Sequence, residues 1–357
     1  MSKLDTAPYK GVRDFYPKDQ FIQNYIFGIW REVAESFGYS EMNASILEPS
    51  ELYKEKSGEE IVNEQTFTFT DRGERKVTLR PEMTPTVARM IAARKRELGF
   101  PLRWYSIQNF FRYEAPQKGR LREHWQLNAD AFGIENLETD IELISLANAI
   151  MYRFGAKDSD FVIKVNYGDN DAEKLGEIVG QLEIRGIKNI KIDPALARGQ
   201  TYYTGAVFEI FDTNPENSRS LLGGGRYDDL MGLFDAEKIP AVGFGSGDVT
   251  IRDFLQTHGL LPEYKNSATL ALLPIEKKYF DVAGKIANEL RKKKVNVFID
   301  WTDKKVGDKI KNADKQKISF IAVVGEDEMV NKQFKLKNLK TGEEREVTLD
   351  KIPECVR

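Results

Sequence analysis

FRYEAPQKGRLREHWQLNAD, residues 111–130, is the stretch that decides how this chain folds. It joins two long aromatic-rich segments, RWYSIQNFFRYE (103–114) and HWQLNADAFG (124–133), through a polar and basic loop. Two such segments in succession predict an antiparallel hairpin with a long tip. On the outgoing strand, Arg112 and Glu114 stand two residues apart and therefore share one face.

The returning strand carries a polar face as well. Gln126, Asn128 and Asp130 alternate with apolar residues, so all three point to the same side. A sheet face with Arg, Glu, Gln and Asp is too polar for a core, and buried charges must be paired or bind a ligand. The alternative is a solvent-exposed face held by salt bridges. The interleaved aromatic residues favour a sheet covered on both faces, and hence a binding site, with Arg120 and Arg122 in the adjoining loop.

The rest of the first 265 residues has the same antiparallel character. Helices are expected over 20–37, 84–98, 140–154, 170–186 and 248–256, and strands over 46–49, 65–70, 76–79, 161–166, 202–212, 218–225 and 239–247. This order predicts an α+β fold, in which a large antiparallel sheet is flanked by helices.

The pattern changes after His258. A linker is expected over 259–268, and beyond it short apolar strands alternate with amphipathic helices. That alternation is typical of βαβ units and a mainly parallel sheet, followed here by a final hairpin. We therefore expect two domains, 1–265 and 266–357, the second being a smaller α/β domain.

The composition excludes several kinds of chemistry. The chain of 357 residues has one cysteine, Cys355, and two histidines, His124 and His258. These numbers exclude a structural Cys/His zinc site and an internal disulfide, and they disfavour a Ser-His-Asp or Cys-His apparatus. No metal site made of protein ligands alone is expected. With no apolar run of membrane length and no signal-like start, we expect a cytoplasmic protein.

The formal net charge of −3 hides an uneven distribution. Residues 266–357 contain 20 Lys or Arg and 15 Asp or Glu, a charge of +5, which leaves −8 for the rest. Solvated helix faces would explain the basic C-terminal domain. A basic face on a separate α/β module is equally suited to a phosphate backbone.

Three further segments carry candidate site residues. In LARGQTYYTGAVFE (196–209), Arg198 offers a fixed cation with forked donors suited to phosphate or carboxylate, although an Arg before a strand is usually a surface residue. The glycines of GGGRYD (223–228) and IPAVGFGSG (239–247) allow a ligand close to the backbone, or simply form turns. They match neither a P-loop nor a dinucleotide fingerprint. In LRPEMTP (79–85), helix capping would explain the threonine but not the glutamate.

These segments, in this order, resemble the histidyl-tRNA synthetases, a family of class II aminoacyl-tRNA synthetases, over nearly the whole chain. GVRDFYP (11–17) and ILEPSELYKEKSGEE (46–60) resemble the family's opening and motif 1, and FRYEAPQKGR resembles motif 2. LARGQTYYTGAVFE and GGGRYDDL resemble the two histidine-specific motifs, and residues 266–357 resemble the anticodon-binding domain.

The resemblance implies a class II synthetase-type sheet, a homodimer through the motif 1 region, and an ATP-dependent ligation. Histidine would attack the α-phosphate of ATP, which enters with Mg²⁺, and the acyl group would then move to the 3′ end of tRNA(His). Catalysis would rest on Arg112 and Arg198 as preorganised cations. The implied ATP-binding residues are Arg112, Glu114 and Arg120. The implied histidine-binding residues are Glu82, Met83, Thr84, Gln126, Asp130, Arg198, Tyr202 and Tyr203, beside a glycine-rich wall of Gly224, Gly225, Arg226, Gly243 and Gly245.

Four features differ from the family's usual pattern. The familiar Arg-Gly-Leu-Asp-Tyr-Tyr of the family reads Arg198-Gly199-Gln200-Thr201-Tyr202-Tyr203 here. Asp130 stands where the family usually has Glu. Thr250 stands where motif 3 usually ends in an Arg that contacts ATP. About 30 residues, between Gly168 and Arg198, replace the usual insertion domain that contacts the acceptor stem.

Two alternatives to an active ligase are open at the level of sequence. The first is a non-catalytic paralogue, such as the histidine-sensing regulatory subunit of ATP phosphoribosyltransferase, which the absent motif 3 Arg favours. That paralogue typically lacks the C-terminal domain, which this chain has. The second is a tRNA-binding module without ligation.

Overall fold

The structure, a computed structural model, describes residues 4–54, 65–168, 171–196, 203–229, 232, 234 and 237–356. Contacts divide the chain into two compact units, Met1–Pro262 and Glu263–Arg357. Each unit has its own hydrophobic core. Within the described ranges, no helix combines the length and the apolar character that a membrane crossing requires.

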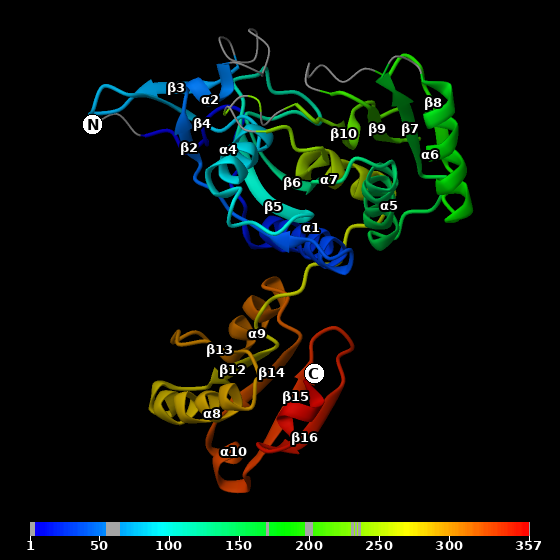
Figure 1. Cartoon of the computed structure of the whole chain (residues 1–357). Helices are drawn as coiled ribbons and strands as arrows, with labels where there is room; N and C mark the ends of the chain where they lie inside the picture. The colour runs from blue at the N-terminus through cyan, green and yellow to red at the C-terminus, as the bar shows by residue number, and fades with distance from the viewer. Residues whose placement is uncertain are drawn as a thin grey trace. The chain divides into compact units, whose positions relative to one another are not determined.

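An eight-stranded sheet forms the centre of the first unit (Figure 1). Its strands follow the order β1-β5-β6-β11-β10-β9-β7-β8. The pairs β1–β5 and β7–β8 run parallel, and the other neighbours run antiparallel. The strands are β1 (Ser40–Glu41), β5 (Leu102–Phe111), β6 (Glu123–Phe132), β7 (Phe161–Tyr167), β8 (Ile190–Ile192), β9 (Ala206–Asp212), β10 (Ser220–Arg226) and β11 (Ala241–Gly247).

Helices α1 (Pro17–Ser36), α5 (Glu138–Arg153) and α7 (Asp248–Thr257) share the main hydrophobic core with this sheet. In α1 the apolar residues recur at helical spacing, so Ile26 and Trp30 turn inward and are fully buried. A further helix, α6 (Ala172–Ile184), packs against β7 and α5. The helices thus cover one side of the sheet and leave its other side available for a site.

A small antiparallel sheet, β2-β4-β3, belongs to the same unit. Its strands are β2 (Leu47–Pro49), β3 (Phe67–Thr70) and β4 (Lys76–Leu79), and helices α2 (Glu51–Lys54) and α4 (Thr84–Arg94) follow β2 and β4 in the chain. Arg80, directly after β4, is buried and donates to the backbone carbonyls of Ala44 and Asn109. Because Asn109 belongs to β5, Arg80 fixes the start of α4 beside the large sheet.

The second unit contains a five-stranded sheet in the order β13-β12-β14-β15-β16. The first three strands are parallel and the last two are antiparallel, as expected for βαβ units that end in a hairpin. Its elements are β12 (Leu270–Pro274), η3 (Lys277–Tyr279), α8 (Phe280–Lys292), β13 (Val297–Ile299), α9 (Val306–Lys315), β14 (Phe320–Val324), α10 (Glu326–Asn331), β15 (Gln333–Asn338), β16 (Glu344–Thr348) and α11 (Ile352–Cys355).

The predicted fold class is confirmed: a large antiparallel sheet with flanking helices precedes a smaller α/β unit. The details differ where tertiary contacts override the local pattern. The outgoing hairpin strand ends at Phe111 rather than Glu114, because the Tyr113 amide donates to the Gln65 carbonyl at 2.7 Å. On α9, Lys309 does not belong to a solvated basic face, since its ammonium is buried against the carbonyls of Pro274 and Asp300.

Candidate functional site

The two faces of β6 differ in chemistry. Leu127 and Ala129 lie in the hydrophobic core beneath the helices. Successive strand residues point to opposite faces, so their neighbours turn to the other side of the sheet. Gln126, Asn128 and Asp130 accordingly line a pocket on that side, as the alternation in the sequence predicts.

Glycines on β11 make room for these side chains. The register of the two strands sets Gly243 opposite Asp130 and Gly245 opposite Asn128. A Cβ atom on Gly243 would stand 1.9 Å from Asp130 Oδ1, and one on Gly245 would stand 2.1 Å from Gln126 Nε2. No real Cβ contact is that short, so any side chain at either position would displace the polar groups of β6.

We call this cavity the Asp130 pocket. Its volume is about 150 Å³. The residues that line it come from α4, the two hairpin segments and three adjoining segments of the sheet. They are Glu82, Thr84, Arg112, Gln126, Asn128, Asp130, Tyr203, Gly223, Tyr227, Gly243, Phe244 and Gly245. Thr84 is the first residue of α4 and does not cap the helix, because the N-cap position belongs to Met83.

The carboxyl group of Asp130 is the most perturbed acid of this pocket. Burial raises its pKa from the usual 3.8 to about 7, and a hydrogen bond from the Tyr227 hydroxyl opposes that rise. Ionisation near neutral pH is a common property of functional carboxyls. Asp130 can therefore accept a hydrogen bond from a polar ligand as a carboxylate or share a proton with it.

A second cavity, the Arg120 pocket, adjoins the first. It has a volume of about 110 Å³, and its lining comes from the hairpin and the start of α7. The lining residues are Arg112, Glu114, Gly119, Arg120, Leu121, His124, Gly247, Val249 and Thr250. Arg112 lines both cavities, so its guanidinium group stands where they meet.

The backbone fixes Arg112 in this position. Its Nε donates to the Pro81 carbonyl at 2.9 Å, which leaves the terminal nitrogens to face the pockets. Nearby, Arg120 Nε lies 2.6 Å from Glu114 Oε2, so these two predicted ATP-binding residues form an ion pair with each other. The Arg120 pocket thus combines one cation held by the backbone with one held by an acid.

His124 also lines the Arg120 pocket. Burial, together with the positive charges of Arg112 and Arg13, lowers the pKa of its imidazole from 6.5 to about 3. His124 is therefore neutral at physiological pH. It adds no charge to a pocket whose cations are arginines.

Asp248, the first residue of α7, holds the surroundings of this pocket together. Its buried carboxylate accepts hydrogen bonds from Arg13 Nη2 at 2.6 Å, Gln23 Nε2 at 2.8 Å and the backbone amide of Trp125 at 2.9 Å. One acid thus joins the N-terminal segment, α1, β6 and α7. The N-terminal segment in turn meets the hairpin, because the Gly11 carbonyl accepts the amide of Arg122 at 2.8 Å.

Some predicted site residues do not line either cavity. Met83 is fully buried in a hydrophobic cluster with Val87 and Ile91. Gly224 and Gly225 serve close packing within the sheet, since a Cβ on Gly224 would stand 1.9 Å from the Gly243 carbonyl oxygen.

Arg226 was expected on the pocket wall, and its side chain turns elsewhere. It is buried and paired with Asp140 of α5, with Nε 3.2 Å from Oδ2, and it also donates to the carbonyls of Ile134 and Asn136. Its contacts therefore hold α5 to β10. Arg198 and Tyr202 lie outside the described residues.

Sequence reasoning gave no individual site role to Tyr227 or His124, which line the cavities. Tyr227 lies in a segment singled out in the sequence, but only the order and register of β6, β11 and β10 bring it to the Asp130 pocket. His124 was counted only as one of two histidines. Within the described ranges, no group of three or more His, Cys, Asp or Glu side chains is arranged to hold a metal ion.

The antiparallel sheet, its arginine-bearing hairpin and the two joined pockets have the arrangement expected of a class II aminoacyl-tRNA synthetase. A family model described as histidyl-tRNA synthetase matches residues 11–167 and 164–248, and a model described as anticodon binding domain matches residues 269–357. The chain belongs to the histidyl-tRNA synthetase family.

Individual relatives agree with this assignment. The chain is 37% identical to a histidine–tRNA ligase of Leptospira biflexa, with 94% of each chain covered, and 34% identical to one of Thermoplasma volcanium, with 96% of this chain and 97% of the relative covered. The apo histidyl-tRNA synthetase of S. aureus has a TM-score of 0.86 and 28% identity, covering 99% of this chain and all of the other. The alignment with the Leptospira relative runs over 410 positions, so several tens of its positions have no counterpart in this 357-residue chain.

Proposed function

We propose that this chain is a histidine–tRNA ligase, which activates histidine with ATP and transfers it to tRNA(His). One observation carries the proposal: Arg112 lines both the Asp130 pocket and the Arg120 pocket. In an adenylation, the amino acid carboxylate and the α-phosphate must meet, and both are negative. A guanidinium group with its Nε already engaged can present its remaining donors to both anions.

The Asp130 pocket is proposed to bind histidine. Asp130, Tyr203 and Tyr227 would hydrogen-bond the imidazole ring. Glu82, Thr84 and Gln126 would receive the ammonium group. A pocket whose buried polar groups must all find partners rejects amino acids that leave them unpaired.

The Arg120 pocket is proposed to bind ATP, which enters with Mg²⁺ on its phosphates. Arg120 would contact the β- and γ-phosphates, and Glu114 would accept a hydrogen bond from the adenine amino group. The Glu114–Arg120 ion pair would then exchange for contacts to the nucleotide. Both charged groups would then have a partner before ATP binds and after it binds.

The chemistry proceeds in two steps. A carboxylate oxygen of histidine attacks the α-phosphorus, a new P–O bond forms, the bond to the β-phosphate oxygen breaks, and pyrophosphate leaves with the electron pair. The ribose hydroxyl at the 3′ end of tRNA(His) then attacks the acyl carbon, and AMP leaves. Arg112, and Arg198 on the strength of the family resemblance, would stabilise the charge that develops on the α-phosphate.

The remaining roles follow the same family logic. We propose residues 1–265 as the catalytic core and residues 266–357 as the domain that binds the anticodon region of tRNA(His), in the cytoplasm.

We also propose a homodimer formed through the motif 1 region. Its β2-β4-β3 sheet exposes Leu47 and Phe69, whose exposed fractions are 42% and 48%. Sedimentation equilibrium tests the dimer, and a monomer at micromolar concentration would contradict it.

Charging of tRNA(His) with labelled histidine tests the proposed function. We expect histidine to be esterified to tRNA(His) in the presence of ATP and Mg²⁺. A protein that binds histidine and co-purifies with a phosphoribosyltransferase, but does not charge tRNA, would instead be the regulatory paralogue. A protein that binds tRNA without charging it or activating histidine would be a binding module.

A further inference from the structure

Most of the cations around the Arg120 pocket are committed to acids. Arg120 pairs with Glu114. Arg252, which follows Thr250 by two residues on α7, lies 2.6 Å from Asp19 of α1, so its charge is directed away from the pocket. Arg13 similarly lies 2.6 Å from buried Asp248.

The first turn of α7 itself supplies no cation to the pocket. Thr250 takes part in the lining, and its hydroxyl lies 3.3 Å from both the Leu221 carbonyl and the Gly247 carbonyl, so it serves the backbone. A bound triphosphate carries several negative charges, and charge-assisted contacts are the strongest means of holding them. The side of the pocket formed by α7 therefore needs a cation from another element.

Arg219, just before β10, lies beside this side of the pocket, in an adjoining cavity that Gly119 and Thr250 also line. Its Nε donates to the carbonyl of Lys118 at 3.2 Å, which places the side chain against the hairpin tip. A Cβ on Gly119 would stand 2.8 Å from Arg219 Cδ and 3.5 Å from Thr250 Cγ2. Arg219 and Thr250 thus approach the same glycine from two elements, and Gly119, with φ of +72°, leaves them the space.

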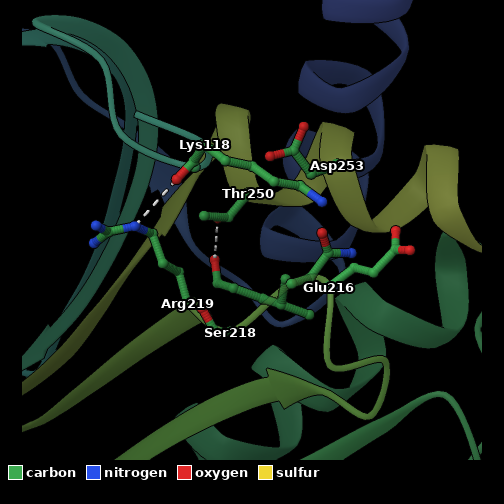
Figure 2. Close-up of a pocket in the computed structure, with 9 residues that line it drawn as sticks. Lys118, Glu216, Ser218, Arg219, Thr250 and Asp253 are labelled. Carbon is green, nitrogen blue, oxygen red and sulfur yellow. Dashed lines mark hydrogen bonds between the residues drawn. The ribbon is translucent and has the colours of Figure 1, made fainter. Parts of the chain in front are cut away.

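Figure 2 shows the cavity that Arg219 and Thr250 line together. Thr250 and Gly119 line both this cavity and the Arg120 pocket, so the two cavities adjoin. Lys118 extends its amine toward Asp253 and Glu216, whereas the guanidinium of Arg219 turns past the Lys118 carbonyl, away from those acids. Within the described part of the chain, the terminal nitrogens of Arg219 have no acid as a partner. They remain available to an anionic ligand.

We propose that Arg219 is a further ATP-binding residue, which contacts the triphosphate from the β10 side and supplies the cation that α7 lacks at Thr250. This inference rests on the proposed function, because it takes ATP as the occupant of the Arg120 pocket. The hydrogen bond to Lys118 gives Arg219 a second effect: it holds the hairpin tip, and with it Arg120, over the phosphates.

Direct titration of Mg²⁺-ATP into wild-type and variant protein tests this role. Loss of one charge-assisted contact is expected to weaken ATP binding about 10- to 100-fold in Arg219→Ala. The affinity for histidine should change less than about twofold. Arg185→Ala is the matched control, since Arg185 lies at the end of α6 and pairs with exposed Glu138; it should bind ATP as the wild type does.

A second variant separates charge from folding. In Arg219→Ala/Thr250→Arg the cation returns from α7, and we expect most of the lost ATP affinity to return with it. Equal ATP affinity in wild type and Arg219→Ala would overturn the role of Arg219 while leaving the proposed function intact. A wild-type protein that does not bind Mg²⁺-ATP would overturn both. Weak ATP binding in Arg219→Ala without recovery in the double variant would assign Arg219 to holding the hairpin tip, and not to the phosphates.

Discussion

The Tyr227 hydroxyl donates a hydrogen bond to the Asp130 carboxylate, and this contact joins β6 to the segment that follows β10. Both residues are buried, and both line the Asp130 pocket. The pKa of Asp130 is raised to about 7 by burial, even with this hydrogen bond present. The pocket therefore contains an acid whose charge changes within the physiological range.

Histidine binding should depend on the charge of Asp130. Above pH 7 the carboxylate accepts a hydrogen bond from the imidazole N–H, and below pH 7 its protonated form does so less well. We expect the affinity for histidine to rise between pH 6 and pH 8, with a midpoint near 7. Calorimetric titration over this range measures the effect.

The comparison variant is Asp130→Asn, which keeps the shape and removes the titration. Free histidine titrates identically in both experiments, so the difference between the two profiles reports on Asp130. If the two profiles run parallel from pH 6 to pH 8, the carboxyl does not control histidine binding.

The same pKa shift has a consequence for stability. In the unfolded chain Asp130 ionises near 3.8, and in the fold it ionises near 7, so the folded state binds more protons between these values. The free energy of unfolding is therefore unaffected by the ionisation of this carboxyl below pH 3.8. It falls as the pH rises to about 7, by about 4 kcal/mol at most. Asp130→Asn should therefore raise the melting temperature at pH 8 by more than at pH 5. Equal shifts at both pH values would mean that Asp130 ionises normally.

Gly243 should be indispensable for histidine binding. Gly243→Ala puts a methyl group where Asp130 Oδ1 stands, so we expect histidine affinity to fall at least about 100-fold, the loss of one or two good hydrogen bonds. The Arg120 pocket does not include Gly243, so ATP binding should persist. Gly176→Ala on α6, where a Cβ meets nothing within 4 Å, is the control and should bind histidine normally. Unchanged histidine affinity in Gly243→Ala would place the amino acid elsewhere.

Arg198 is expected to contribute much more to the chemical step than to histidine binding. In Arg198→Ala, adenylate formation should fall by a factor of about 100 or more, while the Kd for histidine stays within a few-fold of the wild type. Rapid-quench measurement of histidyl-adenylate, paired with equilibrium histidine binding, distinguishes the two effects. Near-normal adenylate formation would show that Arg198 has another role.

The polar face of β6 could be predicted because period-two alternation is a local property. A strand over these residues is enough to put Gln126, Asn128 and Asp130 on one face of the sheet. In the structure all three line one pocket. The anion-binding role of the hairpin could be predicted as well, because the sequence itself shows arginines beside a glutamate in that segment.

Contacts between distant segments could not be predicted in the same way. Arg226 pairs with Asp140, 86 positions away, and no local pattern distinguishes it from a pocket residue. Tyr227 meets Asp130 only because β11 separates β6 from β10 with glycines that leave the space between them open. Arg219 is likewise an ordinary residue before a strand until the fold brings Thr250 and the hairpin tip beside it.

Histidine-dependent exchange of labelled pyrophosphate into ATP by the wild-type protein is the most direct test of the central claim. Adenylate formation is reversible, so labelled pyrophosphate reacts with the histidyl-adenylate to give labelled ATP. This exchange requires histidine and ATP to bind at one joined site. We predict exchange with histidine and none with the other standard amino acids, without any need for tRNA. Absence of exchange in folded protein that binds both histidine and Mg²⁺-ATP would contradict the claim that Arg112 joins the two pockets into one adenylation site.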